Sequence, residues 1–119
     1  MTGQICDKAQ LDALLSLGGR ALCDQFVADL ERCQARFTEA LGLAAGDKRQ
    51  ALESARRALH ELRGIALTVG ATPLTRDCAK AEAFCDLGHL KEVLEAQTEI
   101  LATCEMLTAL IQAYSERAS

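Results

Sequence analysis

Apolar residues recur every three or four positions along most of the chain. Between about residues 20 and 43 they form one stripe with spacings of four, four, three, four and four: Leu22, Phe26, Leu30, Cys33, Phe37 and Leu41. This is the spacing of an amphipathic helix. The sequence contains no alternating β-branched run and no Asn-Gly turn that would indicate a hairpin. The pattern therefore predicts an all-α protein.

Turn signals divide this pattern into five helices. A short helix of about residues 7–17 begins with a capping box of Asp7 and Gln10 and ends at Gly18-Gly19. Long helices follow over about residues 20–43, 48–69, 73–88 and 89–116. Gly70 is expected to end the third, and Thr72-Pro73 is typical of an N-cap followed by proline in the first turn. Short loops between long helices predict an antiparallel four-helix bundle with a short additional N-terminal helix, as one domain over residues 1–119.

Composition narrows the classes of partner. Of 119 residues, 13 are basic and 17 acidic, which gives a net charge of −4, and the chain has no Trp. This balance argues against nucleic acid or an anionic membrane as the main partner. We find no secretory signal and no apolar run of transmembrane length. The expected location is the cytoplasm.

The six cysteines contain no CxxC pair, and several occupy apolar helix positions. Buried free cysteine behaves as a small hydrophobic residue. We therefore interpret them as reduced core residues rather than a disulfide framework.

His60 is expected on the solvent face of its helix. At about 100° per residue, the apolar face of this helix is centred roughly opposite the imidazole. Glycine inside a helix costs about 1 kcal/mol against alanine, so a glycine one turn after His60 needs a reason. The residues on the histidine side of the helix are Arg56, Arg57, Arg63, Gly64 and Leu67.

Such a face suits transfer of an anionic group onto the ring. Neutral imidazole is a good nucleophile near pH 7, and guanidinium groups can stabilise charge on a phosphoryl group. Gly64 leaves the ring uncrowded on one side, and Leu67 could belong to a docking patch. The residues alone leave open the simpler interpretation, a solvated helix face with an incidental histidine.

The segment His60-Glu61-Leu62-Arg63-Gly64, followed by Ala66, Val69, Gly70 and Ala71, resembles the motif of the histidine phosphotransfer (HPt) domain. Leu74, Cys78 and Glu82 are similar to the family's following helix, and the resemblance extends over nearly the whole chain. Arg63 stands where lysine is usual and keeps the positive charge. Ile65 stands where a small hydroxyl residue is usual and is expected to add packing at the edge of the apolar face.

The resemblance implies a phosphocarrier. His60 would be phosphorylated by the aspartyl phosphate of a receiver domain and would pass the group to another receiver in a multistep phosphorelay. Arg63 would stabilise the transferred group, with Arg56 or Arg57 helping, and Gly64 would let the receiver approach. The carrier needs no cofactor or metal of its own, because Mg²⁺ is expected on the partner receiver. No ATP site is recognisable, so autonomous kinase activity is not expected.

The implied partners are receiver domains of response regulators or hybrid histidine kinases, bound by a monomer. Since the chain starts with Met1 and holds only this domain, we expect a free-standing carrier. One alternative is a pseudo-HPt adaptor bundle that binds receivers or other signalling partners without phosphotransfer. Another is a metal or redox protein that uses Cys85 and His89, although Gly88 between them is expected to end the helix.

Overall fold

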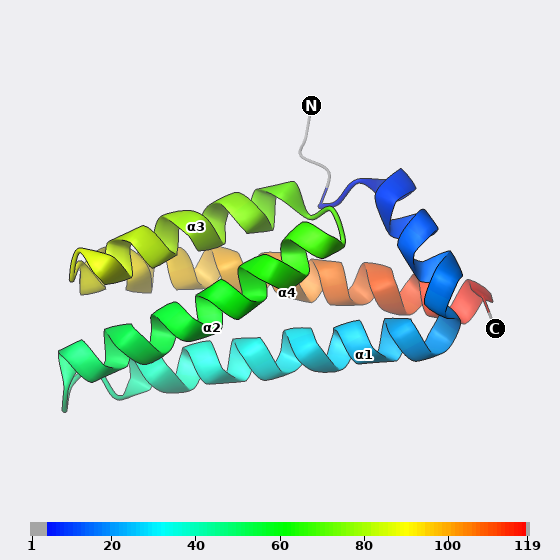
Figure 1. Ribbon diagram of the computed structural model, residues 1–119. Helices are drawn as coiled ribbons and strands as arrows, with labels where there is room; N and C mark the ends of the chain where they lie inside the picture. The colour runs from blue at the N-terminus through cyan, green and yellow to red at the C-terminus, as the bar shows by residue number, and fades with distance from the viewer. Residues whose placement is uncertain (1–4, 119) are drawn as a thin grey trace.

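The computed structural model describes residues 5–118 and contains four helices, α1 (Lys8–Gly42), α2 (Lys48–Thr68), α3 (Thr72–Asp86) and α4 (Leu90–Ala118). No strand occurs in this part of the chain. Figure 1 shows consecutive helices running in opposite directions, and each packs against its neighbours, with α4 closing against α1. The predicted all-α antiparallel bundle is therefore confirmed.

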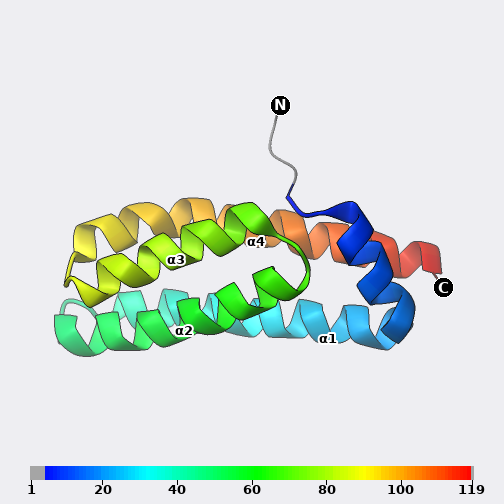
Figure 2. The same cartoon turned by 45° about the horizontal axis from the view of Figure 1, so that its top comes forward.

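The first two predicted helices join without a loop. They form α1, which bends at Gly19, where the backbone takes φ 60° and ψ −149°. Glycine reaches this region at little cost because it has no Cβ. Figure 2 shows the segment before the bend turning away from the axis of the rest of α1. The predicted boundary at Gly18-Gly19 is thus a kink.

The segment before the kink is tied to the end of α2. The predicted cap of Asp7 is present, since its side chain accepts a hydrogen bond from the Gln10 backbone N–H. The second hydrogen bond of the capping box, from the Asp7 backbone N–H to the Gln10 side chain, is absent. Asp7 N–H donates instead to the Gly70 carbonyl at 2.9 Å. Gln10 Nε2 donates to the carbonyls of Leu67 and Thr68, at 3.2 and 3.1 Å. Gln10 therefore caps the C-terminus of α2.

The turn from α2 to α3 is very short. Gly70 has a φ of 76°, as predicted for a helix-ending glycine, and the Ala71 N–H bonds back to the Ala66 carbonyl at 2.8 Å. Thr72 is consequently already the first residue of α3. The prediction of Thr72 as N-cap is wrong, because the cap position is Ala71, without a side-chain bond.

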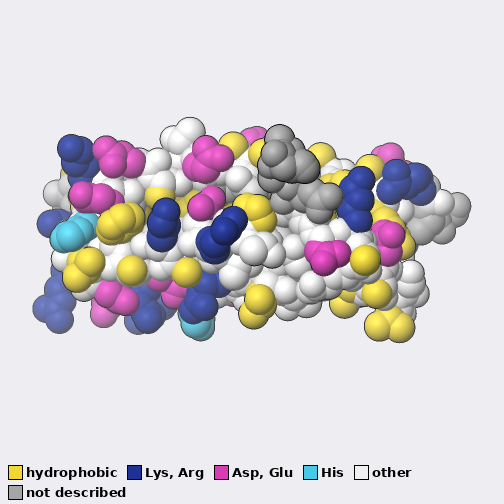
Figure 3. Space-filling view, turned by 90° about the horizontal axis from the view of Figure 1, so that it is seen from above, with side chains coloured by type: hydrophobic (Ala, Val, Ile, Leu, Met, Phe, Trp, Pro, Cys, Tyr) yellow, Lys and Arg dark blue, Asp and Glu magenta, His cyan; other side chains and the backbone are white. Residues whose placement is uncertain are grey.

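One continuous core lies between the helices. All six cysteines are free and buried, as predicted: Cys6, Cys23, Cys33, Cys78, Cys85 and Cys104. Ile65 is partly buried against this core, which confirms its expected packing. Figure 3 shows acidic and basic side chains intermixed over the face seen from above. None of the helices described is both long and apolar enough to cross a bilayer.

Candidate phosphotransfer site

His60 lies in the second half of α2, and 64% of its side chain is exposed. This confirms the predicted solvent face. The ring is in contact with α3, because its Nδ1 lies 3.1 Å from Oε1 of Glu82. The Glu82 side chain is only 7% exposed. An accessible imidazole therefore rests against a buried carboxylate.

Arg63, one turn after His60, connects the same two groups. Its Nε donates to Oε2 of Glu82 at 2.5 Å, and its Nη2 lies 3.0 Å from His60 Nδ1. The hydrogen bond to Glu82, and then its charge, raise the pKa of Arg63. The guanidinium thus stays positively charged beside the ring.

The position of Glu82 follows from the pattern of α3. Glu82 shares the buried face of this helix with Leu74, Cys78 and Cys85. A carboxylate at such a position is costly unless charged or polar partners satisfy it. The antiparallel packing of α2 on α3 supplies these partners in Arg63 and His60.

Gly64 is not required by packing within the bundle. A Cβ built at this position would meet nothing within 4 Å. The missing side chain therefore leaves open surface one turn from His60. Leu67, about two turns along the same helix, is 65% exposed. Both lie where the sequence pattern placed them, and their roles stay predictions.

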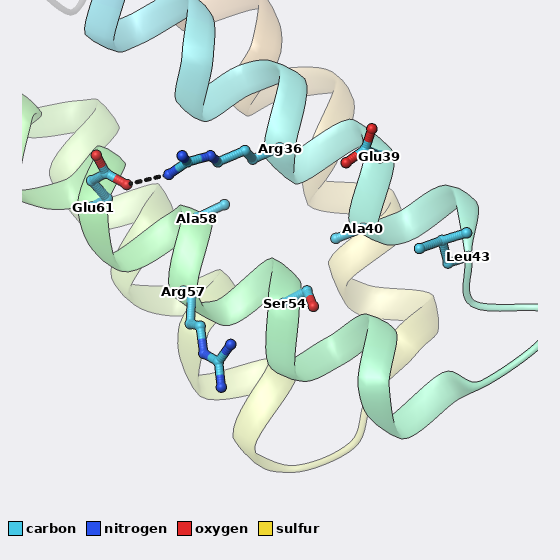
Figure 4. Close-up of a pocket in the computed structure, with 8 residues that line it drawn as sticks. All are labelled: Arg36, Glu39, Ala40, Leu43, Ser54, Arg57, Ala58 and Glu61. Carbon is cyan, nitrogen blue, oxygen red and sulfur yellow. Dashed lines mark hydrogen bonds and ion pairs between the residues drawn. The ribbon is translucent and has the colours of Figure 1, made fainter.

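The other two predicted arginines do not join the site. Arg56 donates from Nε to Asp86 Oδ1 of α3 at 2.7 Å. Arg57 lines a groove of about 250 Å³ between α1 and α2. Figure 4 shows its side chain pointing away from α1 and from the Arg36–Glu61 ion pair, which joins α1 to α2. Within residues 5–118, neither arginine bonds to His60.

In the sequence, Glu82 stands out only as part of the family resemblance, which implies no role for it. The signal was present, since an acidic residue on an otherwise apolar stripe needs a partner. What the sequence could not supply is the register of α3 against α2. That register sets Glu82, rather than another acid of α3, beside His60.

Cys85 and His89, considered as a ligand pair, lie in different surroundings. Cys85 is buried, and burial raises the pKa of its thiol to about 11. The His89 ring stacks on Phe84, with centroids 6.2 Å apart. Across the described residues, no three His, Cys, Asp or Glu side chains are grouped so that they could hold a metal ion.

Comparison with known proteins gives one family match. The model of the family described as Hpt domain matches residues 21–116, which include His60, Arg63 and Glu82. Searches of curated proteins and of solved structures found no significant match. Hpt domains act in histidine phosphotransfer in phosphorelays, where they interact with receiver domains. The match spans most of the chain, so this protein belongs to the Hpt domain family.

Proposed function

We propose that His60 accepts a phosphoryl group from the aspartyl phosphate of a receiver domain and passes it to the aspartate of another receiver. The observation that carries this proposal is the exposed imidazole with its Nδ1 against the buried carboxylate of Glu82. A carboxylate accepts hydrogen bonds, so it favours a proton on Nδ1. The lone pair then resides on Nε2, the ring nitrogen that is free to attack.

The transfer forms one bond and breaks another. Nε2 attacks phosphorus in line, the N–P bond forms, and the P–O bond to the donor aspartate breaks to leave its carboxylate. The Nδ1 proton stays on the ring and donates to Glu82. Position and electrostatic stabilisation supply most of the rate in such transfers. In the second transfer the same chemistry runs in reverse, and the phosphoryl group passes from Nε2 to the aspartate of another receiver.

The surrounding residues take separate roles in this proposal. Arg63 stabilises charge on the transferred group through its guanidinium. Gly64 leaves room for the receiver, and Leu67 supplies an apolar contact about two turns along the helix from His60. Arg56 and Arg57 contribute positive charge to the docking surface rather than contacts to the phosphoryl group, since Arg56 is paired with Asp86.

The proposed partners are receiver domains of response regulators or hybrid histidine kinases. Mg²⁺ belongs to the receiver, and the carrier supplies no metal ligand. We further propose a monomer, because the histidine face must stay open to a receiver. The six free cysteines suit the reducing cytoplasm as the place of transfer.

Phosphoramidate, a small phosphoryl donor, tests the acceptor without a partner. Intact-protein mass spectrometry should show one phosphoryl adduct on the wild-type protein, and acid should remove it. His60→Gln should show none. His89→Gln is the matched control, because His89 is the second of the two histidines in the chain, and it should keep the adduct.

An adduct that persists in His60→Gln would contradict the proposal. So would an acid-stable adduct, since a phosphoramidate bond is acid-labile. A wild-type protein that takes no phosphoryl group from phosphoramidate or from phosphorylated receiver domains would support the alternative, an adaptor that binds receivers without transfer.

A further inference from the structure

Two side chains lie within hydrogen-bond distance of Nδ1 of His60, and they require opposite roles of this atom. Glu82 Oε1 lies 3.1 Å away and, as a carboxylate, can only accept a hydrogen bond. Arg63 Nη2 lies 3.0 Å away and, as a guanidinium, can only donate. Nδ1 offers either one proton or one lone pair in the ring plane. It can therefore satisfy one neighbour at a time.

The choice made at Nδ1 decides the state of the other ring nitrogen. If Nδ1 donates to Glu82, neutral imidazole carries its lone pair on Nε2 and can attack phosphorus. If Nδ1 accepts from Arg63, the proton lies on Nε2, which then has no lone pair for attack. The two contacts thus correspond to a reactive and an unreactive tautomer.

We propose that Arg63 competes with Glu82 for Nδ1 of His60, so that Arg63 restrains the histidine in the free protein as well as stabilising the phosphoryl group. This inference rests on the proposed function. When the guanidinium turns toward an incoming phosphoryl group, its Nη2 leaves Nδ1. Glu82 then remains the partner of Nδ1, and the reactive tautomer is selected as the donor arrives.

The two competitors differ in freedom of movement. The Arg63 side chain is 36% exposed, whereas Glu82 is 7% exposed. The long arginine can reorient at the surface, and the buried carboxylate cannot. A buried charge without a partner is costly. Loss of an Arg63 contact therefore makes the hydrogen bond from the Nδ1 proton to Glu82 more favourable.

Arginine is suited to this double contact. Its Nε donates to Glu82 Oε2 while Nη2 of the same plane reaches His60 Nδ1, and Nη2 is also 3.5 Å from Glu82 Oε1. A guanidinium presents several donors in a fixed fork, whereas a lysine ammonium is a single point. The competition therefore depends on the arginine that this chain has at position 63.

Nitrogen-15 NMR of the imidazole measures the tautomers directly, without any phosphoryl donor. The spectra are recorded at a pH where the ring is neutral. In Arg63→Met the ratio of the Nδ1–H to the Nε2–H form should rise roughly three- to tenfold, as expected for loss of one hydrogen bond of ordinary strength at a partly exposed site. Glu82→Gln should lower the ratio. Arg56→Met is the control, since Arg56 pairs with Asp86, and it should leave the ratio unchanged.

A ratio that stays constant in Arg63→Met, or that moves toward the Nε2–H form, would overturn the inference. Thermal melting checks that Glu82→Gln still folds. If it does not, the result for Arg63→Met, at a partly exposed position, is decisive by itself. Failure of the proposed function looks different, because wild-type protein would then take no phosphoryl group whatever its tautomer ratio.

Discussion

At the scale of single residues, Gly64 is not needed for the stability of the fold but is needed for the proposed transfer. It lies in the interior of α2, and no atom would obstruct an added Cβ. Gly64→Ala should therefore raise the free energy of unfolding by about 1 kcal/mol, because alanine has the better helix propensity. The same methyl group would stand where a receiver approaches His60. Urea unfolding measures the first effect, and the rate of transfer from a phosphorylated receiver measures the second.

Phosphoramidate supplies the control for Gly64→Ala. This donor is small, so its rate should not change while transfer from a receiver slows. A less stable variant would show that the glycine serves packing within the bundle. Equal receiver rates would remove Gly64 from the docking surface.

The residues around His60 show how far sequence reasoning reaches at this scale. The helical spacing placed His60 and Arg63 on one exposed face, and both lie there. It also placed Arg56 near His60, but Arg56 pairs with Asp86, 30 positions away along the chain. Spacing along one helix predicts which side chains share a face. It does not predict which acid of the next helix each of them meets.

At the scale of the elements, the end of α2 is fixed by the segment before the kink in α1. Gln10 caps two carbonyls of α2, and the Asp7 N–H bonds to Gly70. The sequence predicted a short N-terminal helix and its cap. It could not predict this docking, because Gln10 and Thr68 are 58 residues apart. The family match starts after this segment, at residue 21.

Two glycines with nearly the same positive φ test this docking. Gly70 and Gly88 have φ values of 76° and 75°, so alanine at either should cost about 1 kcal/mol of backbone strain. At Gly70 the new Cβ would also lie 2.9 Å from the Gln10 side chain, whereas at Gly88 it would meet nothing within 4 Å. Gly70→Ala should therefore lower the free energy of unfolding more than Gly88→Ala, as measured in urea. Equal losses in the two variants would mean that the N-terminal segment can move away from Gly70 without a loss of stability.

At the scale of the whole molecule, the bundle is long and flat, 46 × 30 × 17 Å, with one core along its length. Five of the six cysteines contribute to this core from α1, α3 and α4, and Cys6 contributes from the segment just before α1. Their apolar spacing predicted that they would be buried. The sequence could not predict how strongly burial acts on each thiol, because that depends on what the neighbouring helices place around it.

This burial predicts a loss of stability in alkali. Burial raises the pKa of Cys33 to about 11 and of Cys104 to about 12, from an ordinary value of 9.0. Between pH 9 and these raised pKa values, both thiols stay protonated in the folded protein, whereas the unfolded chain has already released the same protons. The two thiols therefore make their full contribution to the stability below about pH 9, and this contribution is lost as the pH rises through 11 and 12. Urea unfolding from pH 8 to 12 should show the free energy of unfolding falling over this range.

Removal of one thiol isolates its share of the alkaline loss from that of all other groups. Cys104→Ala should be less stable than wild type at pH 8, since it leaves a cavity in the core. Its free energy of unfolding should nevertheless fall less steeply above pH 9, by up to about 1.4 kcal/mol per pH unit, because one proton fewer is released. Parallel curves for the two proteins would mean that Cys104 ionises alike in the folded and unfolded chain, and that burial does not keep this thiol protonated.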